Sequence, residues 1–390
     1  MMSPPSRSPA LSARAALLAS LLALLAPRVT RAENSLHYKY EDYRESGGRV
    51  AVQTQGAVIE QDFGTALHLK VEGVLDAIAG ATPNGQPAKA GSDQVVLSKL
   101  TERRKAWDAT FSRQFPRVNV TLGAANSRES DYVSTGWSLN TLTDFNQKNT
   151  TLLLGVAGTD DDVTVRFQPG PIKKRTNDLI AGFTQLLDPQ TSVAFNLTWG
   201  RSTGYHADPY KLVQKDTEVI PGVFLPLTFP ENRPHERDKL IALAALNRDF
   251  PALHGTLDGS YRFYRDSFGT TAHTLELQWF QRLHPRFLLR PGVRLYTQGA
   301  ADFYRYKFDG TSIVPLFGRP RPNGPFYSSD FRLSALRTST LGLKAIWTPR
   351  DWLTLDAALE HYVMSGTDGL TPQSAYCRAT VATFGIKFSW

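Results

Sequence analysis

The last thirteen residues of the chain alternate strictly between apolar and polar side chains. In RATVATFGIKFSW (378–390), Ala382, Phe384, Ile386 and Phe388 fall on one side of an extended strand, and Trp390 ends the same face. A period of two is typical of a strand, because a helix would repeat its apolar positions every three or four residues. The pattern predicts a strand with lipid on one side and water on the other, as in a transmembrane β-barrel. An amphipathic edge strand of a soluble sandwich is the alternative for this stretch alone.

The same period recurs along the chain in about sixteen segments bounded by turn residues, each long enough to cross an outer membrane at a tilt. The predicted strands are 36–43, 49–59, 65–76, 103–114, 117–127, 132–145, 150–157, 177–187, 191–201, 239–249, 254–266, 270–283, 287–298, 337–348, 351–362 and 378–390. The pattern therefore predicts an all-β fold, a closed antiparallel transmembrane barrel of about sixteen strands.

The connections between these segments differ in length in a regular way. Tight turns, such as Asp188-Pro189-Gln190, follow the even-numbered strands. A soluble sandwich has no reason to sort its loops by parity, whereas a barrel with short periplasmic turns and long extracellular loops does so by construction. The long segments, all of which follow odd-numbered strands, are 77–102, 158–176, 202–238, 299–336 and 363–377.

Charged residues alternate with the apolar ones on the later strands. Because a charge on the lipid face costs a few kcal/mol at mid-bilayer, the charged side should face a water-filled lumen. Opposed charges there can select solutes by charge. Alternatively they pair across neighbouring strands and only complete the wall, and Arg262, Glu276 and Arg294 are candidates for such a structural network. The predicted pore-lining residues are Arg262, Glu276, Arg290, Arg294, Lys344, Asp356 and Glu360.

The N-terminal segment predicts export. Arg7 and Arg14 precede a short apolar run, 15–26, and small residues lead to Ala32. A basic region, a short apolar region and a small-residue cleavage site describe a secretory signal peptide, and the run is too short to span a bilayer. We expect 1–32 to be removed and 33–390 to form a barrel in the bacterial outer membrane. A retained amphipathic anchor is the alternative.

Composition narrows the function further. The chain carries a formal net charge of +8 without a concentrated basic patch, which argues against nucleic acid as a partner. Its one cysteine, Cys377, cannot form an internal disulfide or a cysteine-based metal or redox framework. No Ser/His arrangement or metal-ligand spacing stands out, so we expect no enzyme, no cofactor and no metal site. A barrel enzyme is the least favoured of the function classes.

One long loop carries an apolar run that would be sticky if it were exposed. This run, VIPGVFLPLTF (219–229), lies in the proline-rich loop 202–238. Our hypothesis is that it folds into the barrel and narrows the lumen. The alternative is that it packs against the second proline-rich loop, 299–336.

Several stretches resemble the bacterial outer-membrane family DUF3570, a domain family of unknown function. They are ENSLHYKYEDYRESGGRVAVQT (33–54), LDAIAGATPNGQP (75–87), Asp208-Pro209-Tyr210-Lys211, SYRFYRDSFG (260–269), RLYTQGAADFYRY (294–306) and DFRLSALRTSTLGLK (330–344). The resemblance covers nearly the whole mature chain and implies the barrel fold and the outer-membrane location. It implies no activity and no catalytic residues.

Together these observations predict a porin-like channel that passes small polar solutes through a charged lumen. The alternative is a non-conducting barrel that serves as a structural or assembly partner for periplasmic or surface proteins. Outer-membrane lipid is an expected partner in either case. So is the outer-membrane assembly machinery, through the C-terminal strand that ends at Trp390.

Overall fold

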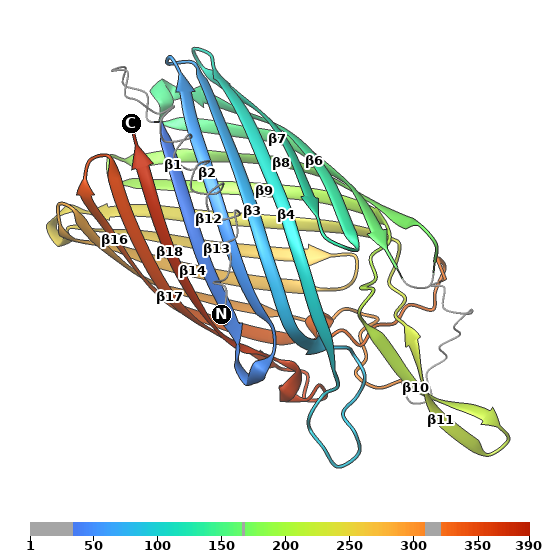
Figure 1. Ribbon diagram of the computed structural model, residues 1–390. Coiled ribbons are helices and arrows are strands. Elements are labelled where there is room, and N and C mark those ends of the chain that lie inside the picture. Colours follow the sequence, from blue (N-terminus) through green and yellow to red (C-terminus); the bar gives the residue numbers. More distant parts are fainter. Residues whose placement is uncertain (1–33, 166–167, 309–320) are drawn as a thin grey trace, which may run out of the picture.

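The computed structural model describes residues 34–165, 168–308 and 321–390, and the predicted signal peptide lies outside them. Sixteen strands in this part of the chain form one closed antiparallel barrel, which confirms the predicted fold class (Figure 1). The barrel strands are β1 (Ser35–Glu45), β2 (Ala51–Phe63), β3 (Leu67–Pro83), β4 (Leu97–Gln114), β5 (Val118–Arg128), β6 (Tyr132–Phe145), β7 (Thr150–Thr164), β8 (Pro171–Asp188), β9 (Thr191–Gly204), β12 (Glu236–Phe250), β13 (Gly255–Asp266), β14 (Thr271–His284), β15 (Phe287–Gln298), β16 (Leu336–Arg350), β17 (Leu353–Gly366) and β18 (Arg378–Ser389).

The first and last strands close the barrel. β1 pairs with β18 from Ser35 opposite Ser389 to Glu45 opposite Ala379. The backbone N–H of Trp390 also donates to the carbonyl of Asn34 at 3.0 Å. Because every strand then has two neighbours, the sheet has no open edge and its backbone groups can be satisfied inside hydrocarbon.

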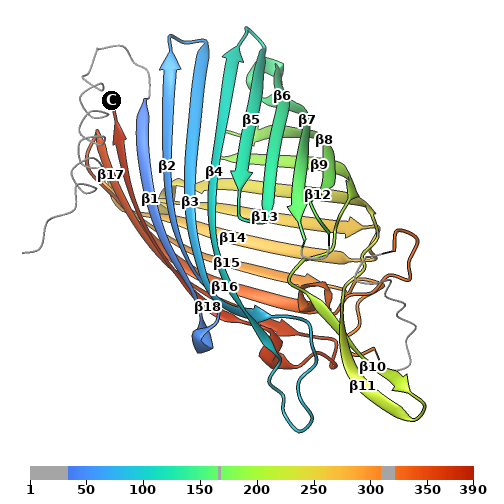
Figure 2. The same ribbon diagram turned by 45° about the vertical axis from the view of Figure 1, so that its right-hand side comes forward.

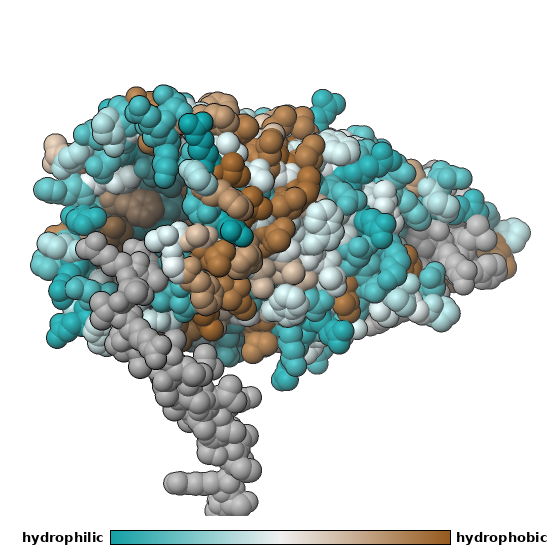
Figure 3. Space-filling view, turned by 90° about the horizontal axis from the view of Figure 1, so that it is seen from above, coloured by the Kyte–Doolittle hydropathy of each residue, from teal (hydrophilic) through white to brown (hydrophobic). Residues whose placement is uncertain are grey.

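The apolar side chains face outward. On β14, Leu275 and Leu277 are 41% and 38% exposed, and they alternate with Thr274, Glu276 and Gln278. Figure 3 shows apolar residues gathered in a band across the wall, with hydrophilic surface toward both ends. A wall whose apolar side is uncovered by protein is the arrangement that a surrounding bilayer requires.

Short turns and long loops lie at opposite ends of the barrel, as the parity of the connections predicts. β8 and β9 are joined through Pro189-Gln190 alone, whereas β15 and β16 are joined by residues 299–335. Several strands continue further toward the loop end than predicted, and the loop expected at 77–102 is reduced to 84–96. Strand pairing can continue beyond the bilayer because the ladder depends on backbone hydrogen bonds and not on lipid.

The apolar run of the loop 202–238 does not fold into the lumen, so that hypothesis is wrong. It belongs to a hairpin of β10 (Leu212–Ile220) and β11 (Val223–Pro230), which projects from the loop end of the barrel (Figure 2). Ile220 and Phe224 at its tip are 61% and 60% exposed. The two strands pair with each other, which satisfies their backbone groups without the barrel.

The base of this hairpin follows the alternative expectation and packs against the loop 299–335. Val213 is fully buried there in a cluster with Phe308 and Tyr327, and Phe229 packs against the same cluster. Helical structure in the described residues is limited to single 3-10 turns. Within those residues, none is long and apolar enough to cross a membrane.

Candidate functional site

The inner wall brings together five of the seven predicted pore-lining residues. Strands β14 to β17 place them around one cavity of about 220 Å³. The register explains the grouping, since Glu276 lies opposite Arg294 and Arg290 lies opposite Lys344. Inward positions on adjacent strands therefore form a continuous charged surface. The predicted residues that line this cavity are Glu276, Arg290, Arg294, Lys344 and Glu360.

One pair in this lumen cavity is a cross-strand ion pair. Arg294 Nε lies 4.0 Å from Glu276 Oε2, and the two side chains are 54% and 40% exposed. The side-chain amide of Gln278 also donates to Glu276 at 2.7 Å. At this exposure the pair contributes little to stability, of the order of 0–1 kcal/mol. Both groups therefore remain accessible to a solute.

Asp356, also predicted to line the pore, is not among the residues that line this cavity and instead links strands of the wall. Its carboxylate lies 2.6 Å from Lys344 Nζ and 3.6 Å from His37 Nε2, and its side chain is 7% exposed. The contact with His37 on β1 passes over β18 at Gly385, where an added Cβ would lie 2.2 Å from Asp356 Oδ2. The missing side chain of Gly385 thus allows one carboxylate to connect β16, β17 and β1 across the closure of the barrel.

Arg262 stands apart from the cavity. Its guanidinium carbon lies 5.6 Å from the centre of the Tyr264 ring. The structural network predicted for Arg262, Glu276 and Arg294 therefore holds for the last two residues and not for Arg262. Arg290 similarly lies 5.6 Å from the Phe280 ring centre. Within the described residues, neither Arg290 nor Glu360 forms an ion pair, so both charges face the cavity without a protein counter-ion.

The long loops form a compact structure that the sequence did not predict. We call the segments 84–96, 205–235 without the hairpin tip, 299–308, 321–335 and 367–377 the loop cap. Phe268, at the β13–β14 turn, buries itself with Tyr304 and Leu333 of the loop 299–335. Phe331 of the same loop packs with Tyr376. The largest buried side chains of the described chain lie at this end and not in the barrel interior.

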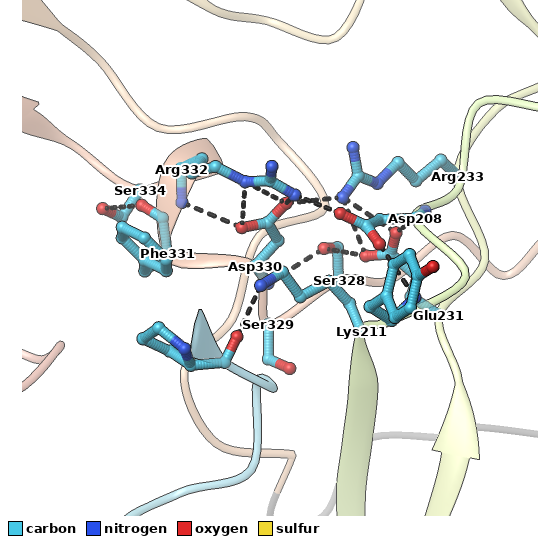
Figure 4. Close-up of polar contacts among 12 residues, drawn as sticks. Asp208, Lys211, Glu231, Arg233, Ser328, Ser329, Asp330, Phe331, Arg332 and Ser334 are labelled. Atoms are coloured by element: carbon cyan, nitrogen blue, oxygen red, sulfur yellow. Dashed lines mark hydrogen bonds and ion pairs between the residues drawn. The ribbon is translucent and has the colours of Figure 1, made fainter. Parts of the chain in front are cut away.

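A buried ion network joins two segments of the loop cap (Figure 4). The guanidinium of Arg233 lies 2.8 Å from both Glu231 and Asp330, whose side chains are each 1% exposed. Arg332 lies 2.6 Å from Asp330 and also pairs with Asp208. Because two of these carboxylates lie out of water, their cations and hydrogen bonds are needed to offset the cost of burial.

The pKa values of the two buried carboxyl groups, Glu231 and Asp330, shift in opposite directions. Burial raises the pKa of Glu231 above its usual value, although Arg233 acts against this shift. Burial alone would also raise the pKa of Asp330, but Arg332 and Arg233 together hold it below its usual value. Asp330 therefore stays ionised through its two guanidinium partners, and Glu231 depends on the one cation beside it, Arg233.

Lys211 connects this network to a third segment of the loop cap. Its ammonium group is almost fully buried and donates to the carbonyl of Pro83 at the end of β3. Nζ also lies 5.7 Å from the centre of the Phe331 ring. Burial lowers the pKa of Lys211, and nearby Asp330 acts against this shift. The lysine thus holds the start of the 84–96 segment beneath the network.

A second cavity, of about 510 Å³, lies beside the loop cap. His206 lines it, with Nε2 2.8 Å from Ser202 Oγ and Nδ1 3.0 Å from the carbonyl of Pro234. Burial and the neighbouring Lys174 lower the pKa of His206 from 6.5 to about 4. We call this space the vestibule. Aromatic hydroxyls and charges of both signs surround it, from Tyr132, Tyr210, Tyr264, Glu129, Asp131, Lys174, Arg237 and Lys239.

Sequence reasoning missed the network and the vestibule. Asp208-Pro209-Tyr210-Lys211 was noticed only as part of a family resemblance, and its contacts lie more than 100 residues away, at Pro83 and Arg332. The feature of the sequence that indicates such a network is the density of charged residues within the proline-rich loops. In the described part of the chain, no three His, Cys, Asp or Glu residues gather as metal ligands.

Comparisons with known structures find a receptor, a secretin and a channel, all at low sequence identity. A siderophore receptor, PirA from Pseudomonas aeruginosa, is 12% identical with a TM-score of 0.43, and the match covers 92% of this chain but only 62% of the receptor. A bacterial polysaccharide outer membrane secretin is 8% identical, with a TM-score of 0.49 and coverage of 93% and 100%. The CymD monoaromatic hydrocarbon channel is 12% identical, with a TM-score of 0.40 and coverage of 92% and 88%. Similarity at this level carries no argument about activity.

No curated protein matches the chain significantly. A family model described as a protein of unknown function, DUF3570, matches residues 10–374. This match extends over most of the barrel and most of the loop cap, and it confirms the resemblance seen in the sequence. The chain therefore belongs to the DUF3570 family.

Proposed function

We propose that this barrel lies in the bacterial outer membrane, after export by the signal peptide 1–32, and passes small polar solutes. The observation that carries the proposal is the lumen cavity, where Arg290 and Glu360 face open space without counter-ions beside the Glu276–Arg294 pair. Unpaired charges of both signs on the water side of a closed wall can replace part of a solute's hydration shell.

The loop cap supports a selective rather than an open pore. A solute entering from the loop end would meet the vestibule first, with its tyrosine hydroxyls and mixed charges. It would then reach the lumen cavity on β14 to β17. Two polar sites in series suit passage of a solute that binds weakly at each, since conduction needs sites that it can both enter and leave.

Conductance of the purified barrel in planar bilayers tests this proposal. We expect ion-conducting steps, and we expect Arg290→Glu to shift the reversal potential in a salt gradient toward cation selectivity. Arg248→Glu is the matched control, because Arg248 lies opposite the outward-facing Leu257 and belongs to the other side of the wall. The absence of conductance, or an equal shift in both variants, contradicts the channel.

The second candidate is a non-conducting barrel that serves as a partner for surface proteins. The β10–β11 hairpin favours it, because its exposed tip carries Ile220 and Phe224 away from the wall. Liposome swelling separates the two functions. Permeation of small sugars or amino acids supports the channel, and an impermeable barrel that is folded, as judged by heat-modifiable gel migration, supports the partner function.

A further inference from the structure

The outer wall carries a groove of about 550 Å³ on the lipid side of β13 to β17. Apolar side chains form its walls, and Leu275 lies opposite both Tyr261 and Leu295 in the register. Ser339 lies opposite Leu295, and the small serine side chain leaves the depression between the larger neighbours. The groove faces the same side as the exposed apolar band, so its surroundings are lipid and not the lumen.

A row of polar residues borders this groove at the loop end of the strands. His273, Thr297, Arg337 and Ser365 lie directly opposite one another across β14, β15, β16 and β17. The Tyr261 hydroxyl and His273 Nδ1 are 2.7 Å apart and fix the corner of the row. A change from apolar to polar side chains between adjacent rows of one wall marks the level of the lipid headgroups.

Two arginines beside the groove, in adjacent rows, have no partner among the described residues. Arg337 lines the groove, and Arg378 lies opposite Val363, which also lines it. Both are exposed, and in the part of the chain that the structure describes neither guanidinium has a hydrogen bond or an ion pair. An outward cation near the bilayer is costly unless it reaches the interface and an anion. The long loops place this end of the wall in the outer leaflet.

We propose that this groove binds a phosphorylated glycolipid of the outer leaflet. One acyl chain lies along Leu275, Leu295 and Val363, and phosphate groups contact Arg337 and Arg378. Guanidinium groups match phosphate oxygens in charge and hydrogen-bond geometry, and the hydroxyls of Thr297 and Ser365 suit the polar sugar. The inference concerns the outside of the barrel and does not depend on solute passage.

Lipid titration of the purified barrel in detergent micelles tests the proposal. The probes are a bisphosphorylated lipid A, the same glycolipid with both phosphates removed, and phosphatidylglycerol. Because each cation near a lipid surface contributes about fivefold in affinity, we expect the phosphorylated glycolipid to bind at least about tenfold tighter than its dephosphorylated form. The variant with Arg337→Ser and Arg378→Ser should lose this preference, and Arg248→Ser at the opposite end of the wall should keep it.

A second variant tests the acyl site separately. Ser339→Phe fills the depression and should weaken both glycolipids, while leaving heat-modifiable gel migration unchanged. Equal binding of the two glycolipids to the unmodified barrel overturns the proposal, as does a preference that survives in the double arginine variant. Phosphatidylglycerol binding as tightly as the phosphorylated glycolipid also overturns it, because the groove would then take any anionic lipid.

Discussion

Arg233 provides the sharpest test of how the loop cap is held together. Arg233→Met removes the guanidinium that lies 2.8 Å from two carboxylates, each 1% exposed, and keeps much of the side-chain volume. Asp330 retains Arg332, but Glu231 loses its only cation in the network. Removing one partner of a buried ion pair typically costs about 3–5 kcal/mol, because it leaves a buried charge without compensation.

This loss should open the loop cap and leave the barrel closed. A cost of about 3 kcal/mol corresponds to a more than 100-fold larger open population, so backbone amides of 321–335 and 205–211 should exchange hydrogen about 100-fold faster. Amides of β14 and β15 should be unchanged, since the network touches neither strand. Hydrogen exchange with mass spectrometry of the barrel in micelles measures both regions in one experiment.

Two further variants decide whether charge is the cause. Arg175→Met removes an even shorter ion pair, at 2.6 Å, whose partners are 67% and 56% exposed, and it should cost less than about 1 kcal/mol. Adding Glu231→Gln to Arg233→Met should restore part of the protection, because the uncompensated charge is gone. If Arg233→Met exchanges no faster than Arg175→Met, the network does not hold the loop cap.

Three other outcomes follow from the same geometry. The pKa of His206 is about 4 in the folded loop cap and 6.5 when the cap is unfolded, so the unfolded form binds the proton more strongly. Acidification from pH 7 to 5 should therefore destabilise the loop cap by about 2 kcal/mol. Hydrogen exchange should show this pH dependence, and His206→Gln should flatten it. Gly385→Val should displace the Asp356 carboxylate, which lies 2.2 Å from the position of the added Cβ, and should lower the stability of the barrel in thermal unfolding by about 1–3 kcal/mol. The control Gly73→Val should leave this stability unchanged, because open space surrounds Gly73. Replacing 219–224 by a short Gly-Ser turn should leave single-channel conductance unchanged, because the hairpin tip is exposed; a larger conductance would mean that the hairpin obstructs the pore.

The barrel could be predicted from the sequence because lipid imposes a repetitive constraint on every strand. The alternation of Leu275, Glu276 and Leu277 already indicates which face of the strand meets lipid, and the other strands show the same alternation independently. Strand ends at the loop side were less predictable, because beyond the bilayer the outward face need not be apolar. β3 continues to Pro83, past a predicted end at 76, through residues without a clear lipid-facing pattern.

The loop contacts could not be predicted in this way. Glu231 and Asp330 are 99 positions apart, and no period relates them. The hairpin was easier to predict from the sequence, because Pro221-Gly222 is a turn dipeptide between two apolar segments. In the structure Gly222 has a φ of 80°, which favours glycine. The hypothesis for the run 219–229 rests on its hydrophobicity alone, and hydrophobicity does not determine which part of the protein a segment packs against.

The location of the buried side chains explains why this protein has two kinds of stability. The barrel wall is held by backbone ladders, and its apolar side chains are covered by lipid, so it has no need of a packed interior. The loop cap lies in water and needs a core of its own, which is formed by its Phe308 and Phe331 together with Phe268 from the β13–β14 turn. Opening the cap therefore breaks a separate cooperative unit and leaves the wall intact.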